Sequence, residues 1–261
     1  MLGIRDSGLS HFGGEECYNT IPFNYHLVSS LLVGLLYLGC LLRWHKELIN
    51  PVNIPKKAPN LVEKVTLVLG IISYVYTFHM KLERKQGFFM LNPCHTTILL
   101  QSVLLLAPDN TTPFMKMLHT TWSGWAFGAF GAFIWPHLEG LSLLEIVLYY
   151  CEHLVILPIG SIVLHRRYGT LRPNFKNCIL AFSVLLLCQV WVLTPLSRIF
   201  KVNINFTLCA SPAEPFWPGW GYHYFTIECF FCNFVSICVR ILMHAYTSLL
   251  CPRHKEPIKD E

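Results

Sequence analysis

The sequence contains few charged residues. Only 13% of its 261 residues are charged, whereas 53% are hydrophobic. Soluble domains carry about 25% charged residues, so this shortage argues against a soluble protein. The sequence also lacks the ten-residue alternating segments of membrane β-barrels, internal repeats, low-complexity tracts, and basic runs interleaved with aromatic residues. These absences favour a helical membrane protein and give no indication of nucleic-acid binding.

Long apolar stretches are present instead. Seven of them approach or exceed the roughly 17–25 residues with which a helix crosses a bilayer. They lie near 24–42, 61–80, 88–107, 113–135, 141–164, 177–197 and 222–250. No basic n-region or clear cleavage site accompanies the first stretch, which argues for a retained span and against a signal peptide. We therefore expect an all-α polytopic bundle of about seven transmembrane helices. It forms a single domain over 1–261, with a short polar N-terminus at 1–23 and a C-terminal tail at 251–261.

Basic residues indicate the orientation of this bundle. The alternating loops on the side of the C-terminus hold 13 Lys and Arg, and those on the side of the N-terminus hold 6. Positive-inside logic places the C-terminus in the cytosol and the N-terminus outside or in a lumen. Three basic residues within 81–85 weaken the contrast. Cys17 and Cys209 fall on the outer side and could pair. The glycosylation sequon at Asn205 falls on that side too, so it is the one that this orientation permits.

The third apolar stretch begins with Asn-Pro-Cys-His at 92–95, an unusual start for a segment that only fills a membrane. Proline is favoured at the first position of a helix, and Asn92 is among the best N-cap residues. The pair predicts a helix start, preceded by an extended segment at 87–91. The plainer alternative is a proline-kinked helix with a packed cysteine and a histidine that faces a pore.

This placement puts Cys94 in the first helical turn. The free N–H groups and the positive end of the helix dipole favour a nucleophilic thiolate there, and the same N–H groups could bind an oxyanion. Gln101 lies two turns further along the Cys94 face and could add a donor. His95 is adjacent to Cys94, so its side chain should point roughly 100° away around the helix. The sequence therefore predicts that His95 is a poor base for Cys94.

A second polar group lies in the fifth apolar stretch. Glu145, Tyr149, Glu152 and His153 form one stripe on a helix that is otherwise Leu, Ile and Val. Ionisable groups inside a membrane usually face a cavity, and His153 can exchange a proton near neutral pH. The stripe predicts a general base at His153 or, as an alternative, a packing network without catalysis. Arg240 in the seventh stretch could pair with Glu152 or bind a lipid phosphate.

Three stretches together resemble the transmembrane protein 164 family: LNPCH at 91–95, LLEIVLYYCEH at 143–153 and VNINFTLCASPAEPFWPGW at 202–220. The resemblance extends from about residue 60 to 250. It implies a cysteine acyltransferase of the endoplasmic reticulum and Golgi, with Cys94 as nucleophile and His153 as its partner. One departure is Glu152, because relatives have an amide there. Glu152 adds a charge beside the proposed base.

The resemblance also implies the substrates. A polyunsaturated acyl chain, typically arachidonoyl, would move from a phosphatidylcholine donor to a lyso ether-phosphatidylethanolamine. The expected route forms an acyl-thioester on Cys94 and needs no metal, nucleotide or acyl-CoA, so we expect no cofactor. Two alternatives stay open: a non-catalytic seven-helix lipid receptor or carrier, and a lipid hydrolase that uses the same Cys and His pair.

Overall fold

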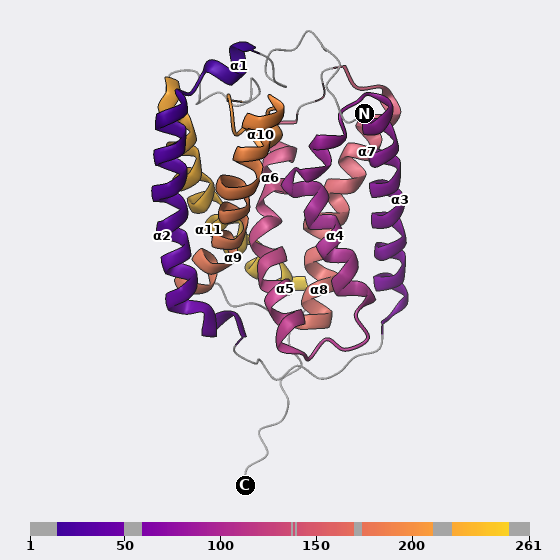
Figure 1. The fold of residues 1–261 in the computed structure, drawn as a ribbon. Helices are drawn as coiled ribbons and strands as arrows, with labels where there is room; N and C mark the ends of the chain where they lie inside the picture. The colour runs from indigo at the N-terminus through magenta and orange to yellow at the C-terminus, as the bar shows by residue number, and fades with distance from the viewer. Residues whose placement is uncertain are drawn as a thin grey trace.

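The computed structural model describes residues 15–49, 59–136, 138, 140–169, 174–210 and 221–250. Within these ranges every regular element is helical, and the long helices run side by side as one bundle (Figure 1). The elements are α1 (Glu15–Asn19), α2 (Phe23–Ile49), α3 (Leu61–Glu83), η2 (Gly87–Leu91), α4 (Pro93–Leu106), α5 (Pro113–Trp125), α6 (Phe127–Ile134), α7 (Leu143–Leu154), η3 (Val155–Ile159), α8 (Gly160–Tyr168), α9 (Phe175–Cys188), η4 (Gln189–Leu193), α10 (Thr194–Phe200), η5 (Ile204–Phe206), η6 (Gly221–His223) and α11 (Tyr224–Leu250).

Five helical segments of the described chain are long and apolar enough to cross a membrane. They are Phe23–Lys46, Leu61–Glu83, Leu143–Tyr168, Phe175–Phe200 and Gly221–Leu250. The expectation of an all-α membrane bundle is thereby confirmed, but the count of seven is not. The stretch at 88–107 forms η2 and the 14-residue α4. The stretch at 113–135 forms α5 and α6, which have 13 and 8 residues.

Two of the five long segments contain a π-helical turn. The turn η3 joins α7 to α8 and contains Pro158, and the turn η4 joins α9 to α10 just before Pro195. Proline cannot donate the backbone hydrogen bond of a regular helix, and π-turns are a common way to absorb such an interruption. Each long segment therefore continues across its proline and still reaches membrane-spanning length.

Local sequence fixes where several helices begin. Ser142 and Glu145 form a reciprocal capping box at the start of α7. Asn60 and Asn174 cap α3 and α9 by accepting a hydrogen bond from a backbone N–H in the first turn. Each cap satisfies a backbone group that a helix leaves unpaired, so the long helices start at defined residues.

Tight contacts hold the centre of the bundle together. Helices α5 and α9 touch at Gly124, where an added Cβ would lie 2.6 Å from the backbone carbonyl carbon of Ala181. Trp122 on α5 and Phe182 on α9 are almost fully buried beside this contact. Large apolar side chains such as Leu61 and Leu249 are exposed on the outside, as expected where a helix faces lipid.

A disulfide joins Cys17 of α1 to Cys209, a pairing that the sequence permitted without establishing it. It lies at the end of the bundle where α1 is found (Figure 1). Asn203 accepts hydrogen bonds from the backbone N–H groups of Leu208 and Cys209, so this segment folds back on itself. The predicted tail 251–261 and the first 14 residues of the predicted polar N-terminus lie outside the described residues.

Asn205, in the sequon that the expected orientation permits, makes tertiary contacts. Its side-chain amide donates to Gln189 Oε1 at 2.5 Å, and its backbone N–H donates to Asn92 Oδ1 at 3.1 Å. Its backbone φ is +48°, a conformation that Asn tolerates better than most residues. The sequon marks Asn205 as a glycosylation acceptor, but in this structure its side-chain amide is hydrogen-bonded to Gln189.

Candidate active site

A cavity of about 560 Å³ opens within the bundle, and Cys94 lies on its wall. Its volume is within the range of known ligand sites. Much of the lining is apolar: Met80, Phe89, Phe127, Trp135, Leu141, Leu148, Phe182, Leu185, Leu186, Phe206 and Cys229. Gly128 and Gly131 of α6 also line it, and a Cβ at either would meet no atom within 4 Å. The cavity therefore has an apolar part with open space beside α6, and this part could accommodate an acyl chain.

Helix α4 begins where the sequence predicted, but the chain before it differs. Pro93 is the first helical residue, and Cys94 lies in the first turn. The expected extended segment is instead the 3₁₀ helix η2, with Phe89 and Met90 buried. A 3₁₀ turn pairs backbone groups internally, as in the bond from the Asn92 N–H to the Phe89 carbonyl. Such pairing is required where water is absent.

Asn92 precedes α4 but makes no side-chain cap. Its Oδ1 instead accepts the backbone N–H of Asn205 at 3.1 Å. The contact ties the start of α4 to the segment that follows α10. Asn92 thus positions the helix start by a tertiary contact, and the first-turn N–H groups of α4 are not taken by an Asn side chain.

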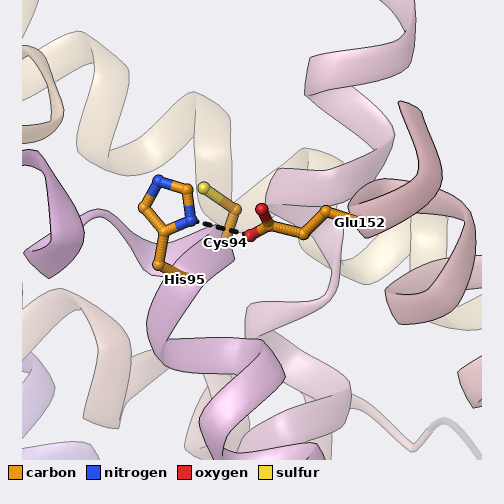
Figure 2. Close-up of side chains that lie close together, drawn as sticks. All are labelled: Cys94, His95 and Glu152. Atoms are coloured by element: carbon orange, nitrogen blue, oxygen red, sulfur yellow. Dashed lines mark hydrogen bonds and ion pairs between the residues drawn. The ribbon is translucent and has the colours of Figure 1, made fainter. Parts of the chain in front are cut away.

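His95 lies close to Cys94, contrary to prediction. One ligand atom each of Cys94, His95 and Glu152 lies within 4.8 Å of the others. His95 Nδ1–H donates to Glu152 Oε1 at 2.7 Å, and both side chains are buried. Figure 2 shows the Cys94 sulfur beside the His95 ring, with Glu152 approaching from α7. The carboxylate on the neighbouring helix holds the His95 ring on the Cys94 side, which angular spacing along α4 alone does not reveal.

His153 lines the same cavity as Cys94. Its Nδ1 lies 2.6 Å from the carbonyl oxygen of Tyr149, one turn earlier on α7. A carbonyl oxygen only accepts, so Nδ1 must carry the hydrogen. In neutral His153 the lone pair is therefore on Nε2, the nitrogen left for other partners. The ring also packs on Tyr149, with 4.3 Å between ring centroids.

Two imidazoles thus line one cavity with the Cys94 thiol, and each has a different partner. His95 is bonded to the Glu152 carboxylate, which stabilises positive charge on the ring. His153 is bonded to a neutral carbonyl, which fixes the tautomer without adding charge. All three of these side chains are buried: His95 is 6% exposed, Glu152 is 1% and His153 is 2%. The arrangement suits a base at His153 and a stabiliser of negative charge at His95.

Other predicted site residues have structural contacts. Glu145 accepts from Arg84 Nη2 at 2.5 Å and completes the α7 cap, at the polar part of the cavity. The Tyr149 hydroxyl donates to the Ala132 carbonyl of α6 at 2.9 Å. Both residues line the cavity. The predicted stripe on α7 therefore holds the walls together and faces the cavity.

Gln101 and Arg240 do not join the site. Gln101 donates from Nε2 to the Val155 carbonyl at 3.0 Å, which links α4 to the π-turn η3, and it does not line the cavity. Two roles were predicted for Arg240, and the first of them, a pair with Glu152, is not formed. Its Nη1 donates to the Asn177 carbonyl of α9, and it lines a different, smaller pocket. The rotation of α11 about its axis decides this, and sequence spacing does not fix that rotation.

The motifs in the sequence did not indicate Lys81 as a site residue. Lys81 and Arg84, near the end of α3, line the cavity together with Cys94. Lys81 Nζ lies 5.5 Å from the Phe89 ring centroid, and Arg84 is paired with Glu145. The signal was present in the sequence, because these two residues are among the three that weakened the charge asymmetry between the sides of the bundle. A basic residue on the side where the positive-inside rule expects few is therefore a candidate for a position in an internal site.

Cys94, His95 and Glu152 include donor atoms that could hold a metal ion. Zinc ligands lie about 2.0–2.3 Å from the ion, which separates neighbouring ligand atoms by more than about 3 Å. The 2.7 Å between His95 Nδ1 and Glu152 Oε1 instead matches one shared proton. The present geometry therefore fits a thiol flanked by hydrogen-bonded imidazoles better than a zinc centre.

Fold and site together define a helical membrane protein with a partly buried thiol and two buried imidazoles in a lipid-sized, largely apolar cavity. The model of the TMEM164 family matches residues 21–239, so the chain belongs to that family. No solved structure matches the chain. The family match covers the cavity-lining helices and both stretches that carry the site.

Proposed function

We propose that the protein is a membrane-embedded acyltransferase that moves a fatty acyl chain between phospholipids through an acyl-thioester on Cys94. The observation that carries this proposal is the Cys94 thiol, which lies beside the His95 imidazole and shares the wall of an apolar cavity with His153. Thiol nucleophiles need a base within reach and a group that orients the base. The Tyr149 carbonyl orients His153.

In the first half of the reaction, His153 Nε2 accepts the Cys94 proton. The thiolate attacks the ester carbonyl carbon of a donor phospholipid, and the carbonyl oxygen becomes an oxyanion. The Cys94 backbone N–H, in the first turn of α4, is a suitable donor to this oxyanion. When the intermediate collapses, the bond to the glycerol oxygen breaks and that oxygen takes the proton from His153. A lysophospholipid leaves, and an acyl-thioester remains.

The second half reverses these steps with another acceptor. His153 removes the proton from the free hydroxyl of a second lysophospholipid, whose oxygen attacks the thioester carbonyl. The carbon–sulfur bond breaks, the diacylated or ether lipid leaves, and the Cys94 thiolate recovers the proton from His153. His95, with the Glu152 carboxylate, stabilises the thiolate that forms before the attack in the first half and reappears when the thioester breaks in the second. Acyl-CoA plays no part in this cycle.

Cavity shape and sidedness support the substrate class. The apolar lining and the open space beside Gly128 and Gly131 suit a long acyl chain. The family resemblance suggests arachidonoyl chains and ether phosphatidylethanolamine products. The Cys17–Cys209 disulfide suits an oxidising lumen. We accordingly propose the endoplasmic reticulum or Golgi as the location, with this end of the bundle lumenal.

The direct test uses purified full-length protein in vesicles. The vesicles contain phosphatidylcholine labelled in the sn-2 acyl chain, with or without lyso ether-phosphatidylethanolamine. We expect labelled ether-phosphatidylethanolamine only when the lyso acceptor is present, and no increase on adding acyl-CoA. Labelled free fatty acid as the main product at saturating acceptor would instead indicate a hydrolase. Retention of all label in phosphatidylcholine would indicate a receptor or carrier.

Replacing Lys81 with Gln should selectively weaken the use of phospholipid donors. Lys81 and Cys94 line one cavity, and in a phospholipid only the glycerol backbone separates the phosphate from the sn-2 ester. A hydrogen bond to a charged group contributes about 1.5–3 kcal/mol, so we expect the KM for phosphatidylcholine to rise about 10–100-fold. Steady-state kinetics with a neutral ester that lacks phosphate should be unchanged.

Lys85→Gln is the matched control, because Lys85 is exposed and does not line the cavity. An equal loss with the neutral ester and with phosphatidylcholine in Lys81→Gln would contradict a phosphate contact. Such a result would assign Lys81 to the stability of the site.

A further inference from the structure

A second pocket lies between α5, α8 and α11. Its volume is about 40 Å³, and its lining includes His119, Trp122, His165, Arg240 and His244. Arg240 is eleven residues beyond Cys229, which lines the active-site cavity, so it is about 16 Å further along α11. In Figure 1, α11 runs from the end that holds α1 toward the end where the C-terminus lies. The two pockets are therefore at different depths of the bundle.

Arg240 is the charged centre of this pocket. Its side chain is only 4% exposed, and its Nη1 donates to the Asn177 carbonyl. Its Nη2 is buried and has no hydrogen-bond partner. Arginine stays protonated in proteins, and buried charges are normally paired. An unpaired, buried guanidinium nitrogen at a pocket wall therefore indicates a missing anionic partner.

Two more ring nitrogens in the lining lack partners. His244 Nδ1 on α11 and the indole Nε1 of Trp122 on α5 are both buried without a hydrogen bond. Trp122 can only donate, and His244 can donate from Nδ1 in one tautomer or when protonated. Three helical positions on two helices thus present unused N–H donors to one small space.

The lining contains no carboxylate among the described residues. Glu63, which is buried at the start of α3, is already paired with Arg167 at 2.9 Å. The lining instead adds two further histidines, on α5 and α8. A pocket with a fixed positive charge, several donors and no acid has the composition of an anion site.

We propose that this pocket binds a phosphate group, as free inorganic phosphate or as the phosphomonoester of a lipid headgroup. On the same measure of volume, about 10–15 Å³ holds one water, so 40 Å³ has room for a tetrahedral anion. The pocket is not fully enclosed, which leaves a path for the rest of a headgroup. The bound phosphate accepts from Arg240 Nη2, His244 and Trp122, and it links α5 to α11. This site is separate from the acyl-transfer site and does not depend on it.

The first test measures phosphate binding to purified full-length protein in detergent, by thermal unfolding across a phosphate titration. A ligand at concentration L that binds only the folded state stabilises it by RT ln(1 + L/Kd), so Tm rises with the logarithm of ligand concentration above Kd. We expect this rise in the wild type, and an apparent Kd at least tenfold higher in Arg240→Gln. We expect a several-fold rise in His244→Gln, whose half-buried side chain can change without loss of the fold. His45→Gln is the control, because it makes the same change on the exposed face of α2.

The second test distinguishes the two sources of phosphate. The protein is placed in phosphatidylcholine vesicles with or without phosphatidic acid, whose headgroup is a phosphomonoester. Loss of phosphate binding in the presence of phosphatidic acid assigns the site to a lipid headgroup, and unchanged binding assigns it to the free ion. Both results support the site. It is overturned if neither probe stabilises the wild type, or if Arg240→Gln and His244→Gln both bind as the wild type does. Neither readout requires acyl transfer, so the outcome is independent of the proposed activity.

Discussion

Cys94→Ala should abolish acyl transfer while leaving the fold intact. Without a nucleophile at this position no acyl-thioester forms. Acyl transfer through another cysteine would lack the imidazoles of His95 and His153, which line the cavity with Cys94. Loss of a nucleophile that acts together with its base typically removes most of the catalytic effect, so we expect at least about a thousandfold lower turnover. The measurement is labelled ether-phosphatidylethanolamine formed in vesicles, with intact-protein mass spectrometry to detect the acyl adduct in the wild type.

Cys151→Ala is the matched control for this change. Cys151 is another free cysteine, lies on α7 two residues before His153, and is exposed on the outer surface. It should keep full activity and the acyl adduct. Substantial remodelling activity in Cys94→Ala would rule out the thioester route, provided that its unfolding temperature matches that of the wild type.

Hydropathy and helix-start residues predict much of this fold from the sequence. The long spans follow from apolar length, and the start of α4 at Pro93 follows from the preference of proline for the first helical position. The expected loops place Cys17 and Cys209 on the same side of the bundle, so their pairing was a possibility that the sequence allowed. These features depend on local sequence and on sidedness, both of which can be read along one chain.

Contacts between helices could not be predicted in this way. His95 turns toward Cys94 because Glu152, on α7, accepts its Nδ1–H, and nothing in α4 itself indicates that acceptor. Gln101 donates a hydrogen bond to the Val155 carbonyl at a π-turn, and the apolar pattern of the sequence does not indicate that turn. Arg240 faces α9 because of the rotation of α11. Each difference arises where a neighbouring helix supplies the partner.

The two histidines at Cys94 should differ in their contributions, and His153→Gln should have the larger effect. His153 presents Nε2 as a base because the Tyr149 carbonyl holds the hydrogen on Nδ1, whereas His95 is held by Glu152. General bases contribute about 10²–10⁴-fold to rates, so we expect a loss of this order in His153→Gln. Glu152→Gln keeps a hydrogen-bond acceptor for His95 but removes the charge, so its loss should be smaller, about tenfold. The measurement is the initial rate of acyl-adduct formation under single-turnover conditions.

Imidazole rescue separates a base from a packing residue. In His153→Ala, the vacated space adjoins the cavity, so added imidazole can enter and accept the Cys94 proton. We expect imidazole to restore part of the adduct-forming rate in His153→Ala, and to have no effect in Cys94→Ala or in the wild type. Rescue of a His95→Ala variant with none of His153→Ala would exchange the two roles and make His95, paired with Glu152, the base. A purely structural role for both predicts no rescue in either variant, because a diffusible imidazole does not restore helix packing.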